Sequence, residues 1–185
     1  FKNIEPNEQV FYEIAGYEDT GKPIMIPQDL SALKRDYKTK GFPETLIYSY
    51  GCEPGQCKEA VYKMSKIVNG VEQVYTWDET VRRCKELGVN TVPELDRFEF
   101  DGDVEKALIR INSFLANDKC AASTLDSRHI IEGVCVRIEL PSNDILDTKI
   151  GTWMVFKHKS FIFGLLEGYL KEKEVETEES VEENQ

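Results

Sequence analysis

The chain has little of what marks a membrane-spanning, secreted or basic nucleic-acid-binding protein. None of its apolar runs approaches the roughly 18 residues that a membrane span needs, and its start lacks a signal-peptide pattern. Positive charge is scarce, because the net charge of the 185 residues is −11 at pH 7. These absences predict no membrane partner, and at first they argue against nucleic acid as a partner.

Cysteines are few and show no paired spacing. The five cysteines are an odd number without a Cys-x-x-Cys motif, which favours a reducing, cytoplasmic setting. Cys84 and Cys135 lie in apolar patterns, so we expect them to be buried thiols. The one zinc alternative combines Cys52 and Cys57 with His129 or His158. Its spacing does not match the usual zinc motifs, so we do not favour it.

Charge is distributed unevenly along the chain. The segment Glu172–Gln185 has seven Glu and one Lys, which accounts for −6 of the −11 and leaves −5 for the rest. This segment is almost without apolar residues and is predicted to be a disordered acidic tail, residues 172–185. The body, residues 1–171, is long enough for a sizeable core, and we expect a monomer. A local basic face could form from Arg128, Arg137, Lys149, Lys157 and Lys159.

The expected secondary structure is mixed rather than regularly alternating. Strands are predicted at 10–14, 46–50, 60–67, 71–75, 131–140 and 152–159, with Asn69-Gly70 as a hairpin turn. Helices are predicted at 27–37, 76–87, 104–115 and 161–170. The clearest helix has a Thr76-x-x-Glu79 capping box at its start and Gly88 at its end. This order predicts an α+β fold with mostly antiparallel sheets.

Two lysines near the end of the chain share one face of a predicted strand. Side chains alternate across a strand, so Lys157 and Lys159 point to the same, otherwise apolar, side. Adjacent ammonium groups repel unless an anion lies between them, and a phosphate is the natural partner. The alternative is an edge strand kept soluble by lysines, which is common. The segment alone favours neither interpretation.

A carboxylate stands at the start of another apolar strand, where Glu132 precedes Gly133. By itself, Glu132 is best explained as a surface residue at a strand end. Magnesium, however, prefers one or two carboxylates plus phosphate oxygens, so one Glu facing a lysine-bound phosphate would suffice as a metal ligand. Glu13, just before Ala15-Gly16, has the same two interpretations. Together, the carboxylate and the lysine pair suggest chemistry on a nucleoside triphosphate.

A family resemblance runs through nearly the whole chain except its tail. Motifs IV and V of the covalent nucleotidyltransferases are similar to Glu132-Gly-Val-Cys-Val-Arg137 and Phe156-Lys-His-Lys-Ser-Phe161. Motifs III and IIIa are similar to Val10-Phe-Tyr-Glu-Ile-Ala-Gly16 and Ala60-Val-Tyr-Lys-Met64. The stretch between motifs IIIa and IV is similar to Cys84-Lys-Glu-Leu-Gly88 with Val92-Pro-Glu-Leu95. Each motif is weak alone, but in this order they resemble ATP-dependent RNA ligases of the nick-sealing type.

The resemblance implies a nucleotidyltransferase (ATP-grasp-like) adenylation domain that uses ATP and Mg²⁺ to join RNA ends in RNA repair. Glu13 would accept hydrogen bonds from the ribose hydroxyls. Tyr62 would stack on the adenine, although an aromatic residue at a strand centre is more often core. Glu132 would help to position the metal. Lys157 and Lys159 would contact the α-phosphate and neutralise charge as pyrophosphate or AMP leaves.

The defining motif of that family is missing. Motif I, Lys-x-Asp-Gly, supplies the lysine that attacks ATP and precedes motif III, but only twelve residues precede Glu13. Lys38-Thr-Lys-Gly41 fits a looser pattern, yet it follows motif III and lacks the Asp, so we treat it as a chance match. We therefore expect the chain to be the C-terminal part of a longer RNA ligase, unable to adenylylate itself. Arg137 is a weaker phosphate candidate, because alternation puts it opposite Glu132.

Three other interpretations stay open. A DNA ligase or capping enzyme shares motifs III to V but continues into an OB-fold domain, for which this chain has only a short apolar segment and an acidic tail. A non-catalytic nucleotide- or nucleic-acid-binding module would keep the fold and lose the nucleophile. An α+β domain whose lysines only face solvent is the third.

Overall fold

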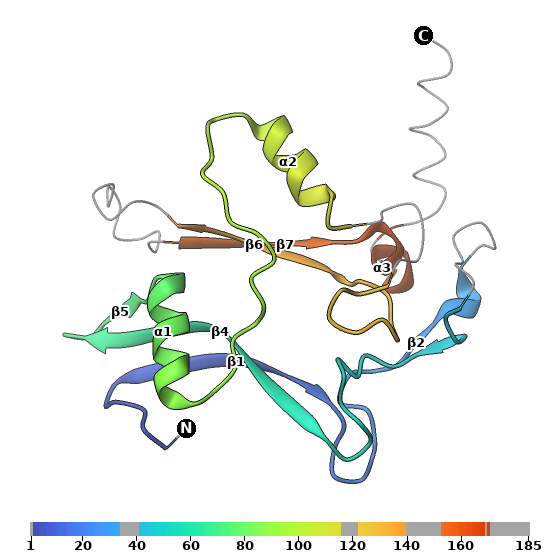
Figure 1. The fold of residues 1–185 in the computed structure, drawn as a ribbon, viewed down its shortest axis with the longest axis horizontal. Helices are drawn as coiled ribbons and strands as arrows, with labels where there is room; N and C mark the ends of the chain where they lie inside the picture. Colours follow the sequence, from blue (N-terminus) through green and yellow to red (C-terminus); the bar gives the residue numbers. More distant parts are fainter. Residues whose placement is uncertain (1, 34–40, 116–121, 140–152, 169, 171–185) are drawn as a thin grey trace. The chain divides into compact units, whose positions relative to one another are not determined.

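A computed structural model describes residues 2–33, 41–115, 122–139, 153–168 and 170. Within them the fold is α+β, with small antiparallel sheets and three α-helices (Figure 1). The chain divides into two compact units. The first unit is Phe1–Ile24, Cys52–Glu99 and Val136–Phe156, and the second unit is Met25–Gly51, Phe100–Cys135 and Lys157–Gln185. The predicted acidic tail, Lys38 and Lys149 lie outside the described residues. No described helix combines the length and apolar character that crossing a membrane requires.

The first unit is built on a three-stranded antiparallel sheet in the order β1-β4-β5. β1 covers Glu8–Gly16, β4 covers Cys57–Val68 and β5 covers Val71–Val74. The turn between β4 and β5 is Asn69-Gly70, with φ values of 53° and 79°. A two-residue hairpin turn requires such left-handed conformations, which Asn and Gly adopt most readily. The hairpin predicted from this dipeptide is confirmed.

A β-bulge interrupts the pairing of β1 with β4. Phe11 is opposite Lys63 and Tyr12 is opposite Val61, which leaves Tyr62 as the extra residue of β4. A bulge of this kind bends its strand and re-aims a side chain. Tyr62 is 40% exposed, while the adjacent Val61 is fully buried.

The helix α1 covers Trp77–Leu87 and follows its sequence signals. The Thr76 hydroxyl accepts a hydrogen bond from the N–H of Glu79, and the Glu79 carboxylate accepts one from the N–H of Thr76. This reciprocal pair satisfies two backbone donors that the first turn leaves unpaired. Gly88 ends the helix with φ 70°, the left-handed conformation that glycine favours at a C-terminal cap.

The core of the first unit lies between α1 and one face of the sheet. Val61, Met64 and Cys84 are at most 1% exposed and pack together there. Val61 and Met64 are three positions apart on β4, so a regular strand would send them to opposite faces. Both reach the core because the bulge at Tyr62 resets the alternation.

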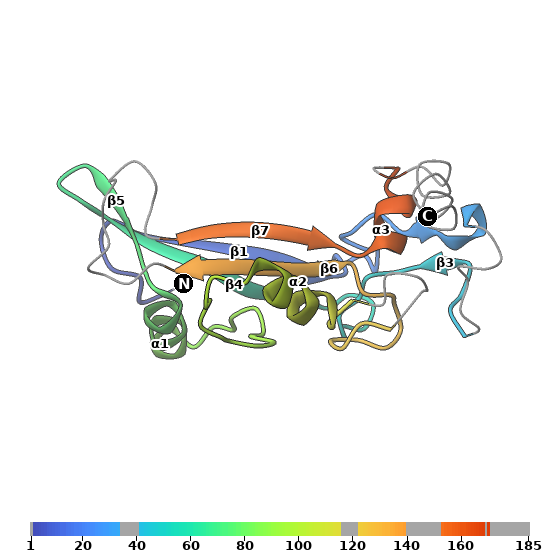
Figure 2. The same cartoon turned by 90° about the horizontal axis from the view of Figure 1, so that it is seen from above.

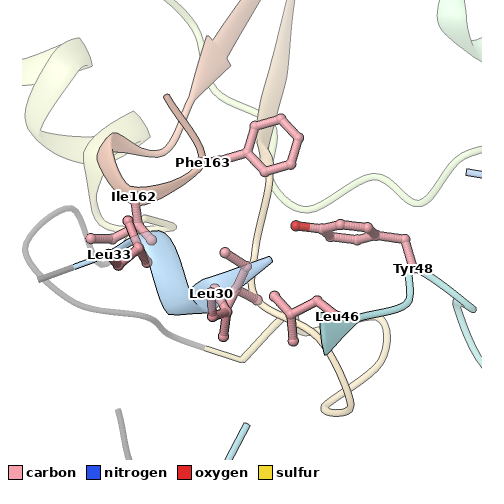
Figure 3. Packing of buried hydrophobic residues seen from close by; sticks show 7 residues of the cluster. Leu30, Leu33, Leu46, Tyr48, Ile162 and Phe163 are labelled. Atoms are coloured by element: carbon pink, nitrogen blue, oxygen red, sulfur yellow. The ribbon is translucent and has the colours of Figure 1, made fainter. Parts of the chain in front are cut away.

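The second unit has its own core among short elements. β2 (Gln28–Asp29) pairs antiparallel with β3 (Thr45–Leu46), next to the 3₁₀ helix η1 (Leu30–Ala32). α2 (Val104–Asn112) and α3 (Phe161–Leu166) belong to the same unit. Figure 3 shows part of the apolar cluster of this unit, whose members come from η1, β3, α3 and connecting segments. Its buried members are Leu30, Leu33, Leu46, Tyr48, Ile130, Ile162 and Phe163.

A further pair of strands, β6 (Gly133–Glu139) and β7 (Trp153–Lys159), forms a two-stranded sheet. Figure 2 shows the two strands side by side and running in opposite directions. The start of β6 and the end of β7 belong to the second unit. α3 follows directly after Ser160, whose hydroxyl accepts a hydrogen bond from the N–H of Phe163 at 3.3 Å. Both strands and the helix after them agree with prediction, although α3 ends earlier.

The helix predicted at 27–37 is wrong for most of its described part. Only the three residues of η1 are helical, where Asp29 caps the turn by accepting from the N–H of Ser31 at 2.8 Å. Leu33 then takes an extended backbone with ψ 145°, which ends the turn. Tyr37, the last residue of the predicted helix, lies outside the described residues.

Two other predictions from local pattern are corrected. The strand predicted at 46–50 is present only at Leu46, the last residue of β3, and Tyr50 has φ +48°, which a regular strand does not adopt. Cys84 is buried as predicted, but Cys135 is exposed. An apolar pattern does not show which face of a two-stranded sheet is covered, and Cys135 lies on an open face of β6.

A buried ion pair ties the start of β1 to α1. The Arg83 guanidinium donates to both carboxylate oxygens of Glu8 at 2.8 Å, and the Tyr75 hydroxyl donates to the same carboxylate at 3.0 Å. The side chains of Arg83 and Glu8 are only 11% and 1% exposed. The Arg83 hydrogen bonds, working against burial, lower the pKa of Glu8 from 4.5 to about 2.

We predict that Arg83→Met lowers the free energy of unfolding of the first unit by about 3 kcal/mol, because it leaves a buried carboxylate without its cation. Urea denaturation measures this difference. The matched control is Arg82→Met, since Arg82 is 64% exposed and pairs with Glu86 at the surface. Removing a surface pair should change stability by less than about 0.5 kcal/mol.

The same difference should depend on pH. A carboxyl with a lowered pKa contributes stability above its unfolded pKa and loses it as pH falls through the folded pKa. The difference in free energy of unfolding between the native protein and Arg83→Met should therefore have its full size above pH 5 and shrink toward about pH 2. Equal losses for the Arg82 and Arg83 variants would contradict the buried pair.

Candidate functional site

The structure brings the main chain of Glu132 beside the end of β7. Glu132 directly precedes β6, and Lys159 is the last residue of β7. The N–H of Ser160 donates to the carbonyl of Glu132 at 2.8 Å, and its hydroxyl donates to the carbonyl of Ile131 at 2.9 Å. Two candidate residues from distant parts of the sequence therefore meet in the second unit.

Gly133 allows this close approach. A Cβ atom at this position would lie 2.4 Å from the carbonyl oxygen of His158 and 2.7 Å from the Cα of Lys159. Both obstacles are main-chain atoms, which cannot move aside as the end of a flexible side chain can. Glycine is thus required here by the neighbouring strand.

The Glu132 carboxylate is held inside a polar and aromatic group. The Tyr50 hydroxyl donates to Glu132 Oε1. The buried His129 ring has its centre 4.5 Å from that of Tyr50. Burial raises the pKa of Glu132, while the Tyr50 hydrogen bond and the charge of Lys159 act in the opposite direction. Another carboxylate, Glu167, adds to the rise because like charges repel.

The two candidate lysines differ in their partners. Lys159 forms an ion pair with Glu167, just after α3, and its ammonium lies 5.0 Å from the centre of the Phe163 ring. Lys157, two positions earlier on the same face of β7, is exposed, and the described residues show no ion pair to it. A phosphate would therefore meet one open ammonium and one that already has a carboxylate.

Glu13 and Tyr62 both belong to the three-stranded sheet of the first unit. Val10 packs against the core on the α1 side, so alternation along β1 places Glu13 on the opposite face. Tyr62 is the extra residue of the bulge, where alternation does not hold, and it is 40% exposed. Glu13 pairs with Ala60, close along β4 to the bulge. The two residues therefore lie near each other on neighbouring strands, and the pairing assigns a face only to Glu13.

Arg137 is engaged within the protein. Its guanidinium donates to Glu139 at 2.6 Å and to the carbonyl of Tyr75 at 2.7 Å, and it lies 5.7 Å from the centre of the Trp77 ring. These contacts join β6 to the start of α1. They give Arg137 a structural role, so it is the weakest of the phosphate candidates.

The described residues show little of the predicted basic face. Arg128 pairs with Asp126, Arg137 with Glu139 and Lys159 with Glu167. Only Lys157 among the described candidates has no ion pair given by the structure. The face would therefore attract nucleic acid less strongly than its sequence suggests, and a phosphate would have to compete with internal carboxylates.

Metal ligands are sparse in the part of the chain that the structure describes. It has no group of three or more His, Cys, Asp or Glu side chains placed to hold a metal ion, so the zinc alternative gains no support there. A magnesium ion bound with substrate needs less from the protein, because phosphate oxygens and water fill most of its positions. One oxygen of Glu132 bonds to Tyr50 and the other could serve such an ion, so this carboxylate fits that role.

Three residues that contact the candidate residues are not predicted from the sequence. They are Tyr50, Glu167 and Asp126, the partners of Glu132, Lys159 and Arg128. The sequence pattern predicts a strand at 46–50 that includes Tyr50, although the adjacent Gly51 signals a turn. Glu167 lies next to the predicted motif V segment, but nothing in the local pattern indicates that it pairs with Lys159. Such partnerships arise from tertiary packing and carry no short-range signature.

We predict that Gly133→Ala destabilises the second unit by about 3 kcal/mol, because the new methyl group would push β6 away from β7. Urea denaturation gives the energy, and NMR shifts of the His158 and Lys159 amides report the displacement. The matched control is Gly168→Ala in the same unit, where a Cβ meets nothing within 4 Å but φ is 72°. Gly168→Ala should lower the free energy of unfolding by about 1 kcal/mol, because alanine disfavours a left-handed backbone. Equal costs, with unmoved amides, would contradict the close approach.

Comparisons with known proteins supply no relative from which to transfer a function. A scan against models of protein families, a search of curated proteins and a search of solved structures each gave no match. Any assignment therefore depends on the residues and contacts described above.

Proposed function

We propose that this chain is part of an ATP- and Mg²⁺-dependent RNA ligase that joins a 3′-hydroxyl to a 5′-phosphate. The observation that carries the proposal is the meeting of the Glu132 segment with the end of the Lys-x-Lys strand. A carboxylate for a cation and ammonium groups for phosphate are what nucleotidyl transfer requires close together. The pattern of motifs in the sequence pointed to the same residues.

The first unit would supply the contacts to the nucleoside. Glu13 would accept hydrogen bonds from ribose hydroxyls, and Tyr62 would stack on the adenine. Their nearness on the neighbouring strands β1 and β4 supports this division of roles, and the 40% exposure of Tyr62 leaves side-chain surface for a base. The fold proposed for the parent protein is a nucleotidyltransferase adenylation domain.

The second unit would handle the phosphates. Lys157 and Lys159 would stabilise the negative charge that grows on the phosphate as the leaving group departs. A magnesium ion held by Glu132 and the substrate would neutralise further charge on the phosphates. Lys159 would exchange its Glu167 partner for the phosphate, so Glu167 would hold the ammonium in place before substrate binds.

The attacking lysine is assigned to sequence outside these 185 residues, because they contain no Lys-x-Asp-Gly. In the proposed first step that lysine attacks the α-phosphorus of ATP, and pyrophosphate leaves. An oxygen of the RNA 5′-phosphate then attacks the phosphorus of the lysine-bound AMP, the nitrogen–phosphorus bond to the lysine breaks, and the lysine takes up a proton. Finally the 3′-hydroxyl attacks the phosphorus of the RNA 5′-phosphate, AMP leaves, and the hydroxyl proton goes to solvent.

A non-catalytic nucleotide-binding module of the same fold is the second candidate. The Lys159–Glu167 ion pair favours it, because a lysine already neutralised by the protein is a weaker stabiliser of developing charge. The last step of ligation separates the two candidates, since it starts from a pre-adenylylated RNA and does not need the attacking lysine.

We predict that the full-length protein seals a pre-adenylylated RNA to a 3′-hydroxyl across a nick with Mg²⁺ and without ATP. Lys157→Ala and Lys159→Ala should each slow this sealing about 100-fold, the order expected when one preorganised charge stabiliser is lost. Gel analysis of the joined strand measures the rate. The matched control is Lys106→Ala in the same unit, where an exposed lysine pairs with Asp101. Binding without sealing would favour the module, and normal rates in both lysine variants would refute the site.

We also predict that the isolated 185-residue chain forms no covalent protein–AMP when it is incubated with α-labelled ATP and Mg²⁺. The reason is the missing motif I lysine. Denaturing gel electrophoresis detects the label. A labelled band would place the nucleophile inside this chain, with Lys38 the first residue to substitute, and would overturn the assignment to outside sequence.

A further inference from the structure

Tyr50 occupies an unusual backbone conformation. Its φ is +48°, one of three positive values found for non-glycine residues in the described part of the chain, and Gly51 follows with φ +85°. Left-handed backbone is unfavourable for a residue with a Cβ, and it is most rarely adopted by bulky side chains. Such strain persists only where surrounding contacts hold it, and it is most frequent at functional sites.

Asp126 supplies those contacts. One of its oxygens, Oδ2, accepts from the Ser49 hydroxyl at 3.0 Å and from the N–H of Gly51 at 2.6 Å. Both residues that flank Tyr50 are therefore bound to one carboxylate, whose side chain is only 6% exposed. Burial acts to raise the pKa of Asp126, but its bonds to Arg128, Gly51 and Ser49 outweigh burial and lower it. The clamp stays ionised at neutral pH.

The ring of Tyr50 is held as firmly as its backbone. It packs edge-on against the His129 ring, with a centroid separation of 4.5 Å, and the same imidazole lies 4.8 Å from the Tyr48 ring. His129 is fully buried, and its Nδ1 lies 3.0 Å from the carbonyl oxygen of Ile130, which fixes the imidazole in turn. Backbone clamp and aromatic packing together point one hydroxyl at Glu132 Oε1.

We propose that Tyr50 is a positioning residue, whose hydroxyl holds one oxygen of Glu132 and leaves the other for a divalent cation bound with the substrate phosphates. This inference rests on the proposed function, which gives Glu132 its cation. Groups that orient a metal-binding side chain determine its affinity and geometry nearly as much as the side chain itself. The strain at Tyr50 is explained if the phenol must reach a carboxylate far along the sequence.

The test is a double-mutant cycle in the full-length protein with Tyr50→Phe, Glu132→Gln and the combined variant. Tyr50→Phe keeps the aromatic packing and removes only the hydroxyl. The matched control is Tyr48→Phe, which removes a hydroxyl from the neighbouring ring and leaves the Tyr50–Glu132 bond in place. Two readouts are compared: the sealing rate at varied RNA and Mg²⁺, and Mn²⁺ affinity in the presence of ATP, measured by electron paramagnetic resonance.

Tyr50→Phe should lower kcat about tenfold, leave the KM for RNA unchanged and weaken Mn²⁺ binding about tenfold. Adding it to Glu132→Gln should cause no further loss, because Tyr50 acts through that carboxylate. Tyr48→Phe should match the native protein. Native kcat and Mn²⁺ affinity in Tyr50→Phe, or additive losses in the combined variant, would overturn the inference.

The two readouts keep this inference separate from the proposed function. A native protein that binds Mn²⁺ with ATP but seals no RNA would refute the ligase, and the Mn²⁺ cycle would still decide the role of Tyr50. Absence of Mn²⁺ binding to the native protein would overturn the positioning role itself.

Discussion

The close approach of β6 to β7 at Gly133 is the constraint on which the candidate site depends. A carbonyl and a Cα from β7 occupy the space that any side chain at this position would need. The approach lets Ser160 donate hydrogen bonds to the carbonyls of Ile131 and Glu132, and α3 begins at the next residue. The absence of a side chain at Gly133 thus determines how closely the Glu132 segment can approach β7, the strand that carries Lys157 and Lys159. The chemistry proposed for the second unit is a consequence of how tightly two main chains pack.

Short local networks balance part of the charge in the second unit, where the side chains of Lys159 and Glu167 are 37% and 26% exposed. Burial disfavours the ionised form of Glu132, and a phenol and a nearby ammonium compensate. Lys159 is itself compensated by Glu167. Preorganised groups of this kind lose little on reorganisation when a charged ligand arrives. The same arrangement makes the site sensitive, because removing one member leaves the others without a charge partner.

Local signals predicted the elements that local interactions determine. The capping box at Thr76 and the Asn69-Gly70 turn specify their structures within four residues, and both are present. The helix predicted at 27–37 shrank because Asp29 could cap only a single turn before Leu33 became extended. Tyr50 and Glu132 are 82 positions apart. No short-range pattern reports such a bond, so the sequence indicated the carboxylate and the lysines but not the residues that hold them.

The ion pair of Lys159 with Glu167 bears most directly on what the second unit can do. The phosphate that we propose as substrate would have to replace a carboxylate that is already in place, so the net gain would be a difference between two charge-assisted interactions. A phosphate offers more acceptor oxygens and greater charge, and Lys157, two positions away, can join the same anion. The exchange therefore favours a ligand that reaches both ammonium groups over one that reaches only Lys159. A polyphosphate ester meets that requirement better than a single carboxylate, and this is the physical argument for the nucleotide proposed as the ligand of this strand.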